Sequence, residues 1–412
     1  MNEFPKKSGE FSRGILTGML LMAVALVAAF LLLARLGVIR VFSGEQALPD
    51  DKTIEKLNEV SRLIDERYYD EAPKEEYGDG MLRGVLSTLD DPYAGYFSAE
   101  EYKEQLENVT RQYYGIGSTL TQNAETGRVT VVYVYKDSPA EQAGLKEGDE
   151  ILYVNGLLAR SVELDELVEH IQGEEGTDVE ITVSRKGIKD PIEMTMTRAV
   201  INLPTVDHTM LEDGIGYIML VKFASNTPEE YREAVEDLKK QGMKGLILDV
   251  RYNGGGLYDS CVEIVDEILP KGTIVYTEDK YGHREYASSD EEHKLDVPLV
   301  VLINENTASA SEILAGAIRD HEWGTLIGTK TYGKGVVQVT FGLGDGSAVK
   351  FTVEKYFTPN GENIQDKGIE PDINLEYKFL GGEEDEYDYS FDNQIQKGIE
   401  VLESDPSFEK EK

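Results

Sequence analysis

Cysteine and histidine are scarce in this chain of 412 residues, and their scarcity excludes several kinds of catalytic site. The single cysteine, Cys261, cannot form an internal disulfide, a CxxC redox pair or a cysteine-rich metal site. The five histidines show neither a HExxH motif nor another recognisable metal-ligand or catalytic-triad spacing: His170, His208, His283, His293 and His321. A nucleophile in this chain therefore needs a base other than histidine.

Positive charge is also in short supply. The chain has 41 lysines and arginines against 78 acidic residues, which gives a formal net charge of −37. Nucleic-acid binding depends on lysine and arginine displacing counterions from phosphates, so this composition argues against a nucleic-acid partner and favours protein substrates. The hydrophobic fraction of 40% and the length predict two or three globular domains.

One long uncharged stretch stands out at residues 14–34, with basic residues on both sides. Its 21 residues cover about 30 Å as a helix, the thickness of the hydrocarbon core, whereas a signal-peptide core needs only about 7 to 15 apolar residues. The pattern predicts a transmembrane anchor, with residues 1–13 in the cytoplasm and the acidic remainder outside the membrane. A cleaved signal peptide is the alternative, because residues 25–29 contain a weak A-x-A site.

Hydrophobic spacing divides the rest of the chain into regions. Residues 35–110 show helical spacing, residues 111–200 are rich in strand-forming alternation, and residues 201–380 alternate short apolar runs with helical patterns. These patterns predict a helical region, a small β module and an α/β domain, followed at 381–412 by an acidic tail with a short helix. The expected helices span residues 51–69, 81–89, 99–108, 228–241, 257–269, 309–321 and 395–402, and the expected strands span 129–135, 179–183, 193–197, 218–221, 246–250 and 299–303.

The β module contains two motifs with a shared interpretation. The first consists of Gly115, Ile116, Gly117 and Ser118. Glycines around one apolar residue let backbone N–H groups converge on a terminal carboxylate, while the following strand edge pairs with an incoming peptide. The second motif, SPAEQAGLKEGDEIL at residues 138–152, is longer and more specific. A G-I-G sequence alone would indicate only a turn, but the two motifs together resemble a PDZ domain.

A serine-rich motif, NENTASASEI, follows the predicted strand at 299–303. Ser309 and Glu312 have the spacing of a capping box, in which the serine satisfies free N–H groups at a helix N-terminus. The same position lies in a positive local field, so Ser309 is also a candidate nucleophile. Lys334, between two glycines, is a candidate base if burial lowers its pKa, and a solvated loop lysine is the alternative.

Three motifs of the α/β domain resemble those of the C-terminal processing, or tail-specific, serine peptidases. They are SASE at 309–312, GKG at 333–335 with Gln338, and DVRYNGGG at 249–256, and the resemblance extends over residues 50–378. It implies a nucleophile, a base, a residue that orients the base, and two oxyanion donors. These roles fall on Ser309, Lys334, Gln338, Ala310 and Gly255, with Gly256 as the near alternative to Gly255.

The resemblance also implies a multidomain α+β architecture. An N-terminal membrane helix and a helical cap precede a PDZ-like β module and a crotonase- or ClpP-like spiral α/β peptidase core. The implied reaction is endoproteolysis of proteins near their free C-termini through an acyl-enzyme, without a metal or organic cofactor. By family analogy, the helices of residues 50–110 could support a homodimer.

Three residues depart from the family pattern. Gln172 stands where relatives often have an arginine that couples the PDZ domain to activity, Gly254 replaces a common proline, and Tyr332 replaces a common phenylalanine. The sequence is also compatible with two other functions. One is a PDZ scaffold that captures C-termini without cutting them, and the other is a crotonase-type acyl-CoA enzyme, which would have no reason to carry a PDZ module or an anchor.

Overall fold

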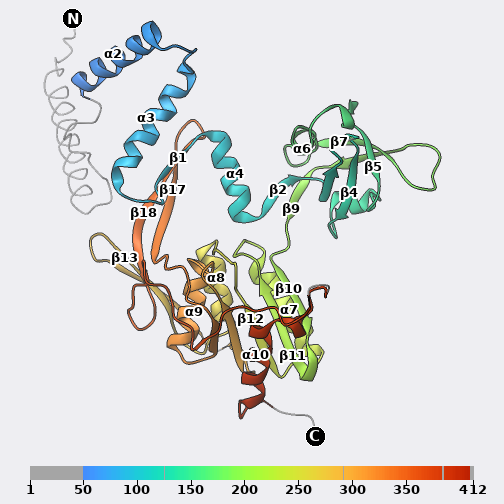
Figure 1. Cartoon of the computed structure of the whole chain (residues 1–412), viewed down its shortest axis with the longest axis vertical. Coiled ribbons are helices and arrows are strands. Elements are labelled where there is room, and N and C mark those ends of the chain that lie inside the picture. The colour runs from blue at the N-terminus through green and yellow to red at the C-terminus, as the bar shows by residue number, and fades with distance from the viewer. Residues whose placement is uncertain (1–49, 125, 291, 383–384, 409–412) are drawn as a thin grey trace, which may run out of the picture. The chain divides into compact units, whose positions relative to one another are not determined.

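The computed structural model describes residues 50–124, 126–290, 292–382 and 385–408 (Figure 1). The predicted cytoplasmic segment and transmembrane anchor, residues 1–34, lie outside this part of the chain. Within the described residues, no helix combines the length and the apolar character that crossing a membrane requires. The anchor therefore stays a prediction from the sequence.

The first compact unit of the chain ends at Tyr77, and its described part is mainly the helix α2 (Asp51–Arg67), followed by the short turn η1 (Lys74–Glu76). Asp50 caps α2 by accepting the N–H of Thr53 at 2.8 Å. Four exposed apolar residues form a stripe along this helix. Its members are between 37% and 53% exposed: Ile54, Leu57, Val60 and Leu63.

The second unit, Gly78–Lys412, begins with short elements that precede the β module. They are α3 (Tyr77–Leu86), which starts in the first unit, η2 (Ser87–Leu89), β1 (Gly95–Phe97) and α4 (Ala99–Thr110). Ser98 and Glu101 form a capping box that begins α4. The helix expected at 81–89 corresponds to the end of α3 together with η2.

The β module is one antiparallel sheet with two helices (Figure 1). Its strands run in the order β3 (Ser118–Gln122), β4 (Val129–Val134), β5 (Glu150–Val154), β7 (Asp178–Ser184) and β8 (Ile192–Thr197), with β6 (Leu157–Leu158) on β5. The helices are α5 (Pro139–Gln142) and α6 (Leu164–Ile171), and β2 (Gln112–Gly115) pairs with β9 (Ala199–Asn202) where the chain enters and leaves. Because β3 is an edge strand, one side of its backbone is unpaired within the sheet.

The α/β domain is built on a six-stranded sheet. Its strands follow the order β10 (Val206–Met210), β11 (Ile215–Leu220), β12 (Gly245–Asp249), β15 (Leu299–Ile303), β16 (Thr325–Gly328) and β19 (Ile373–Asn374). All neighbours are parallel except β10 and β11. The helices α7 (Thr227–Lys240), α8 (Tyr258–Asp266) and α9 (Ala310–Asp320) contribute to the large core on one face of this sheet. Every residue of β12 and β15 is buried, so both faces of these two strands are covered, as is typical of continuous apolar runs.

The opposite face of the sheet is covered by α10 (Asn393–Ser404), which contacts β12, β15 and β16. Ile395 and Leu402 of this helix, and Phe408 beyond it, are buried against alternate residues of the same strands. The sequence predicted this helix as part of an acidic tail. In the structure it is part of the hydrophobic core, although the acidic run precedes it.

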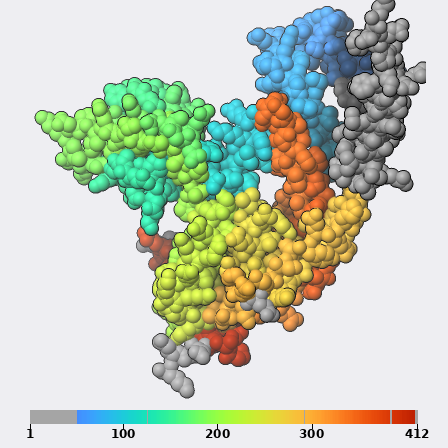
Figure 2. Space-filling model, turned by 180° about the vertical axis from the view of Figure 1, so that it is seen from behind, coloured from blue at the N-terminus to red at the C-terminus, as the bar shows by residue number. Residues whose placement is uncertain are grey.

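A second sheet runs in the order β1, β18 (Ala348–Phe357), β13 (Gly272–Asp279) and β14 (Arg284–Ser289), with β17 (Val336–Gly342) also on β18. Figures 1 and 2 show the long β17–β18 hairpin in orange. The β17 strand starts two residues after Lys334, so the loop leading into this hairpin and the N-terminus of α9 carry the two candidate catalytic residues.

Candidate active site

Ser309 lies at the sharp turn between β15 and α9. Its backbone has φ +57° and ψ −117°, which is unfavourable for a residue with a side chain. Hydrogen bonds to one neighbouring carbonyl hold the turn in place. The N–H of Ala308 donates to the Asn253 oxygen at 3.1 Å, and the Ser311 hydroxyl donates to the same oxygen at 2.8 Å. The site thus maintains a backbone conformation that local preference alone would not favour.

The buried carboxylate of Glu312 ties the two candidate catalytic segments together. Its Oε2 accepts the N–H groups of Ser309 and Lys334, each at 2.9 Å. Its Oε1 accepts the N–H of Gly333 at 2.7 Å and the hydroxyl of Thr331 at 2.6 Å. The bond to Ser309 N–H belongs to the capping box that the sequence predicted. Nothing in the local sequence predicted the three hydrogen bonds to residues 331–334.

Tyr356 approaches the same two residues from their carbonyl side. Its buried hydroxyl lies within hydrogen-bond distance of the Ser309 oxygen, at 3.1 Å, and of the Lys334 oxygen. Burial raises the pKa of this phenol well above its ordinary value, so it remains a proton donor. Sequence reasoning missed Tyr356, because nothing near it in the chain indicates that β18 passes beside α9.

Ser309 and Lys334 line one cleft of about 670 Å³. Burial lowers the pKa of the Lys334 ammonium below its ordinary value of 10.5, and the positive charge of Lys350 lowers it further. The carboxylates of Asp91 and Glu312 oppose this shift. A lysine in such surroundings loses its proton more readily than a solvated one and is suited to act as a base.

The amine of Lys334 does not contact the serine hydroxyl in this arrangement. Its Nζ lies 4.7 Å from the centre of the Tyr93 ring, and no hydrogen bond joins it to Ser309 Oγ within the described chain. Gln338 lines the same cleft from β17, but its amide donates to Thr352 Oγ1 at 3.2 Å and to the Val336 oxygen at 3.4 Å. The three residues therefore share a cleft without being linked to one another.

The candidate oxyanion donors lie beside Ser309. In the described residues, the N–H groups of Ala310 and Gly256 have no hydrogen-bond partner, whereas the N–H of Gly255 donates to Asn253 Oδ1 at 2.9 Å. Gly255 would have to leave that bond to serve an oxyanion. Both glycines lie in the cleft that holds the serine.

Comparison with known proteins shows which family the chain belongs to. Residues 214–375 match the model of Peptidase family S41, residues 130–185 match that of the PDZ domain, and residues 40–101 match the activating protease CtpB N-terminal domain. The chain is 36% identical over 358 residues to the carboxy-terminal processing protease CtpA of Bacillus subtilis, covering 87% of this chain and 76% of that protein. The chain belongs to the carboxy-terminal processing protease family.

Two further members of the family have about the same sequence identity to this chain. The carboxyl-terminal-processing protease of Synechocystis is 36% identical over 341 residues, covering 77% of this chain and 80% of that protein. The carboxy-terminal processing protease CtpB of Bacillus subtilis is 35% identical over 327 residues, covering 78% and 68%. Membership makes this chain a serine-type peptidase with a PDZ domain, as the motifs predicted, and it removes the acyl-CoA enzyme from consideration.

The PDZ motif of this carboxy-terminal processing protease lies just before the edge strand β3. Gly117 has φ +80°, and a Cβ atom there would lie 2.3 Å from the Ser138 Cβ, so only glycine fits. The carbonyl oxygen of Ile116 accepts the Ala140 N–H at 2.8 Å, which joins the motif to the start of α5. Gly115 is buried and Ser118 begins β3, whose free edge is where a peptide strand would add.

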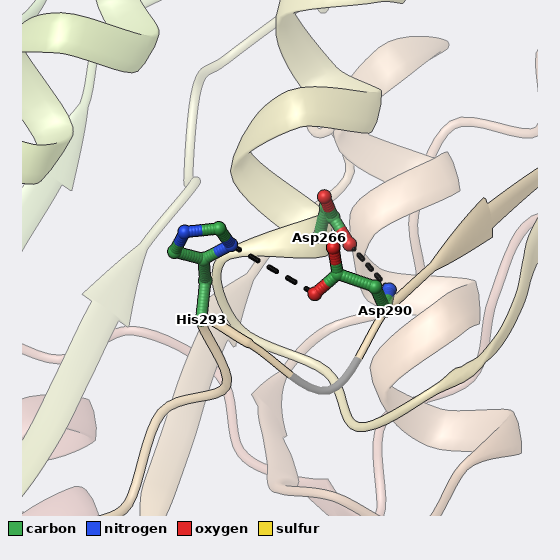
Figure 3. A group of neighbouring side chains, drawn as sticks. All are labelled: Asp266, Asp290 and His293. Atoms are coloured by element: carbon green, nitrogen blue, oxygen red, sulfur yellow. Dashed lines mark hydrogen bonds and ion pairs between the residues drawn. The ribbon is translucent and has the colours of Figure 1, made fainter.

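A separate group of side chains also offers possible metal ligands. Asp266, Asp290 and His293 each place one ligand atom within 4.8 Å of the others (Figure 3). The Asp266 carboxylate accepts the Asp290 N–H at 2.7 Å, and the Asp290 carboxylate lies 3.8 Å from His293 Nδ1. Exposed acidic groups are common on so acidic a chain, and none of these three residues lines the cleft that holds Ser309.

We expect Gly255→Ala to lower kcat by about 10²-fold, comparable to the loss of one oxyanion donor. The new Cβ would lie 2.8 Å from the Ala308 oxygen and 2.9 Å from the Ala310 nitrogen, at a residue whose φ is +97°. The loop must therefore move away from the serine. Steady-state kinetics check this, with Gly254→Ala as the matched control, because a Cβ at Gly254 meets no atom within 4 Å. Equal losses in both variants would contradict the prediction.

Proposed function

We propose that this peptidase is a membrane-anchored serine endopeptidase that cleaves proteins near their C-termini with a Ser309–Lys334 dyad. The observation that carries this proposal is the shared cleft. It brings a serine on a high-energy turn at a helix N-terminus together with a lysine whose pKa is lowered by burial. Glu312 accepts hydrogen bonds from the backbone N–H groups of both residues, so the two segments keep a fixed position relative to each other.

The proposed reaction proceeds through an acyl-enzyme. Ser309 Oγ attacks the peptide carbonyl carbon while the neutral Lys334 amine takes the hydroxyl proton. The N–H of Ala310, with that of Gly255 or Gly256, stabilises the oxyanion. The intermediate then expels the amine of the C-terminal fragment, which receives the proton from Lys334, and water attacks the ester by the same route in reverse.

Lys334 must move before this chemistry begins. Its ammonium lies over the Tyr93 ring, an arrangement that favours the charged form. Loss of the proton weakens that contact and frees the amine to approach the hydroxyl of Ser309. In our proposal Gln338 then orients the amine, which requires its amide to leave Thr352.

Substrate delivery follows from the PDZ domain. We propose that the N–H groups of residues 115–118 bind a terminal carboxylate and that β3 pairs with the residues preceding it. The predicted anchor at 14–34 would hold the catalytic part on the extracytoplasmic side of the cell membrane. The exposed apolar stripe of α2 supports a homodimer as part of the same proposal.

The pH dependence tests the base. Only the neutral amine of Lys334 can accept the serine proton, so kcat/KM should rise with pH and level off above the pKa of Lys334. We expect the midpoint of this rise to lie below 10.5, because burial lowers that pKa. Log kcat/KM measured against pH in the wild-type chain checks this. A flat profile, or a midpoint at or above that of a solvated lysine, would contradict it.

Digestion of an unfolded protein by the full chain tests the proposed function. Mass spectrometry should locate the cuts near the substrate C-terminus, and amidation of that terminus should reduce cleavage. Cuts distributed evenly along the substrate would contradict the proposal that the PDZ domain delivers the substrate C-terminus. Capture of the substrate without any cleavage would favour the scaffold function instead.

A further inference from the structure

The cleft around Ser309 has the opposite charge to the rest of the chain. Three lysines line it, Lys222, Lys334 and Lys350, and among the described residues no aspartate or glutamate does. The whole chain carries a formal charge of −37. A lining of one sign inside a low-dielectric cleft focuses the local potential, so this cleft attracts anions although the surface as a whole repels them.

Two of these lysines have no role in the proposed chemistry. Lys350 lies on β18, with its Nζ 5.0 Å from the centre of the Phe97 ring. Lys222 follows β11, and its ammonium donates to the carbonyl oxygen of Asn108 in the last turn of α4. Neither forms an ion pair within the part of the chain that the structure describes. Burial lowers the pKa of both.

The contact of Lys222 with α4 has an ordinary structural explanation. A cation near a helix C-terminus interacts favourably with the free carbonyl groups there. That contact uses one of the three N–H donors of the ammonium and leaves two free. Lys350 has no such partner, since an aromatic ring accepts no conventional hydrogen bond. Removing part of the water around an unpaired ammonium is unfavourable, and a carboxylate entering the cleft would offset that cost.

We infer that the cleft binds a carboxylate of the substrate beside the scissile bond, and that Lys222 and Lys350 are the residues that bind it. The location of the scissile bond at Ser309 rests on the proposed function. The substrate class is therefore a peptide with negative charge near the cut. That charge has two sources with the same chemistry, the free C-terminus of the substrate or an aspartate or glutamate side chain.

Binding to the Ser309→Ala chain tests this without turnover. Four alanine-rich peptides would be compared by fluorescence anisotropy, with a central glutamate or glutamine and with a free or amidated C-terminus. We expect the carboxylate that occupies the cleft to tighten binding about tenfold. That advantage should disappear in the Lys222→Gln, Lys350→Gln double variant. Lys271→Gln, which alters an exposed lysine outside the cleft, should retain it.

The four peptides separate the two sources of charge. An advantage for glutamate that survives amidation assigns the cleft to acidic side chains. An advantage for the free terminus that is lost in the double variant assigns it to the terminal carboxylate, because the PDZ domain is unchanged there. If the double variant does not fold, the Lys222→Arg, Lys350→Arg pair should keep the preference, and each single glutamine variant should weaken it.

Two results would overturn the inference. One is equal binding of all four peptides by the parent chain, and the other is a preference that the double variant retains in full. Neither depends on catalysis. An absence of cleavage by the chain with Ser309 intact would instead overturn the proposed peptidase mechanism and leave the binding result standing.

Discussion

Replacing Ser309 with alanine is expected to lower kcat by at least about 10⁴-fold and to leave the free energy of unfolding nearly unchanged. The hydroxyl is the proposed nucleophile, and no other serine of the described chain lines the cleft. Its backbone N–H still donates to Glu312 in the variant, and the bonds of Ala308 and Ser311 to the Asn253 carbonyl are unchanged, so the turn keeps its support. Cleavage of an unfolded protein, followed by gel and mass spectrometry, measures the loss.

Lys334→Met should cause a loss of about 10² to 10⁴-fold, because methionine keeps the aliphatic stem but removes the base. The matched control is Lys330→Met in the same loop, whose ammonium pairs at 2.8 Å with Glu370 on the exposed surface. An exposed pair contributes at most about 1 kcal/mol, so this control should be fully active. A Lys334→Met chain with wild-type activity would contradict the dyad.

The sequence was sufficient for the elements whose signals are local. The strand expected at 299–303 has the bounds of β15, and the helix expected at 309–321 is α9 within one residue at each end. Their apolar runs and the capping pair of Ser309 and Glu312 lie within a few residues of one another, which is the range over which periodicity and capping act.

The sequence was insufficient where contacts join distant parts of the chain. No strand was expected in residues 336–357, yet the β17–β18 hairpin places Tyr356 against Ser309. Likewise, nothing in α10 shows that it completes the core of a sheet that begins near residue 206. A buried hydrogen bond between residues 47 positions apart has no periodic pattern, so only the folded chain reveals it.

The family motifs assigned the catalytic roles but did not show how the side chains of the site are arranged. It placed Ser309, Lys334 and Gln338 in one constellation, and the structure places all three in one cleft. The amine over Tyr93 and the amide bonded to Thr352 are side-chain rotamer choices, which a motif cannot specify. The charge of the cleft was equally hidden, because its lysines come from three separate places in the sequence.

Glu312→Gln should be the most damaging single-atom change at this site. The carboxylate accepts two bonds at each oxygen, and the glutamine NH₂ group can only donate. Wherever the NH₂ group points, two donors that are buried or part-buried lose their acceptor. Each such donor costs about 1–3 kcal/mol, so we expect the peptidase core to be destabilised by about 2–6 kcal/mol.

The single tryptophan, Trp323, packs against this core, so its fluorescence during urea denaturation measures the effect. Glu305→Gln is the matched control, since that exposed carboxylate accepts only one hydroxyl, from Thr329 at 3.0 Å. It should shift the free energy of unfolding by less than about 0.5 kcal/mol. A Glu312→Gln chain as stable as this control would show that the bonds at Glu312 contribute little.

Activity of Glu312→Gln separates positioning from stability. Under conditions where the variant is fully folded, kcat should still fall by about 10²-fold, because a shift of about 1 Å between the serine and lysine segments is enough for such a loss. KM should change little, since Glu312 is buried and does not line the cleft. A folded variant with normal kcat would mean that Tyr356 alone holds Ser309 and Lys334 in register.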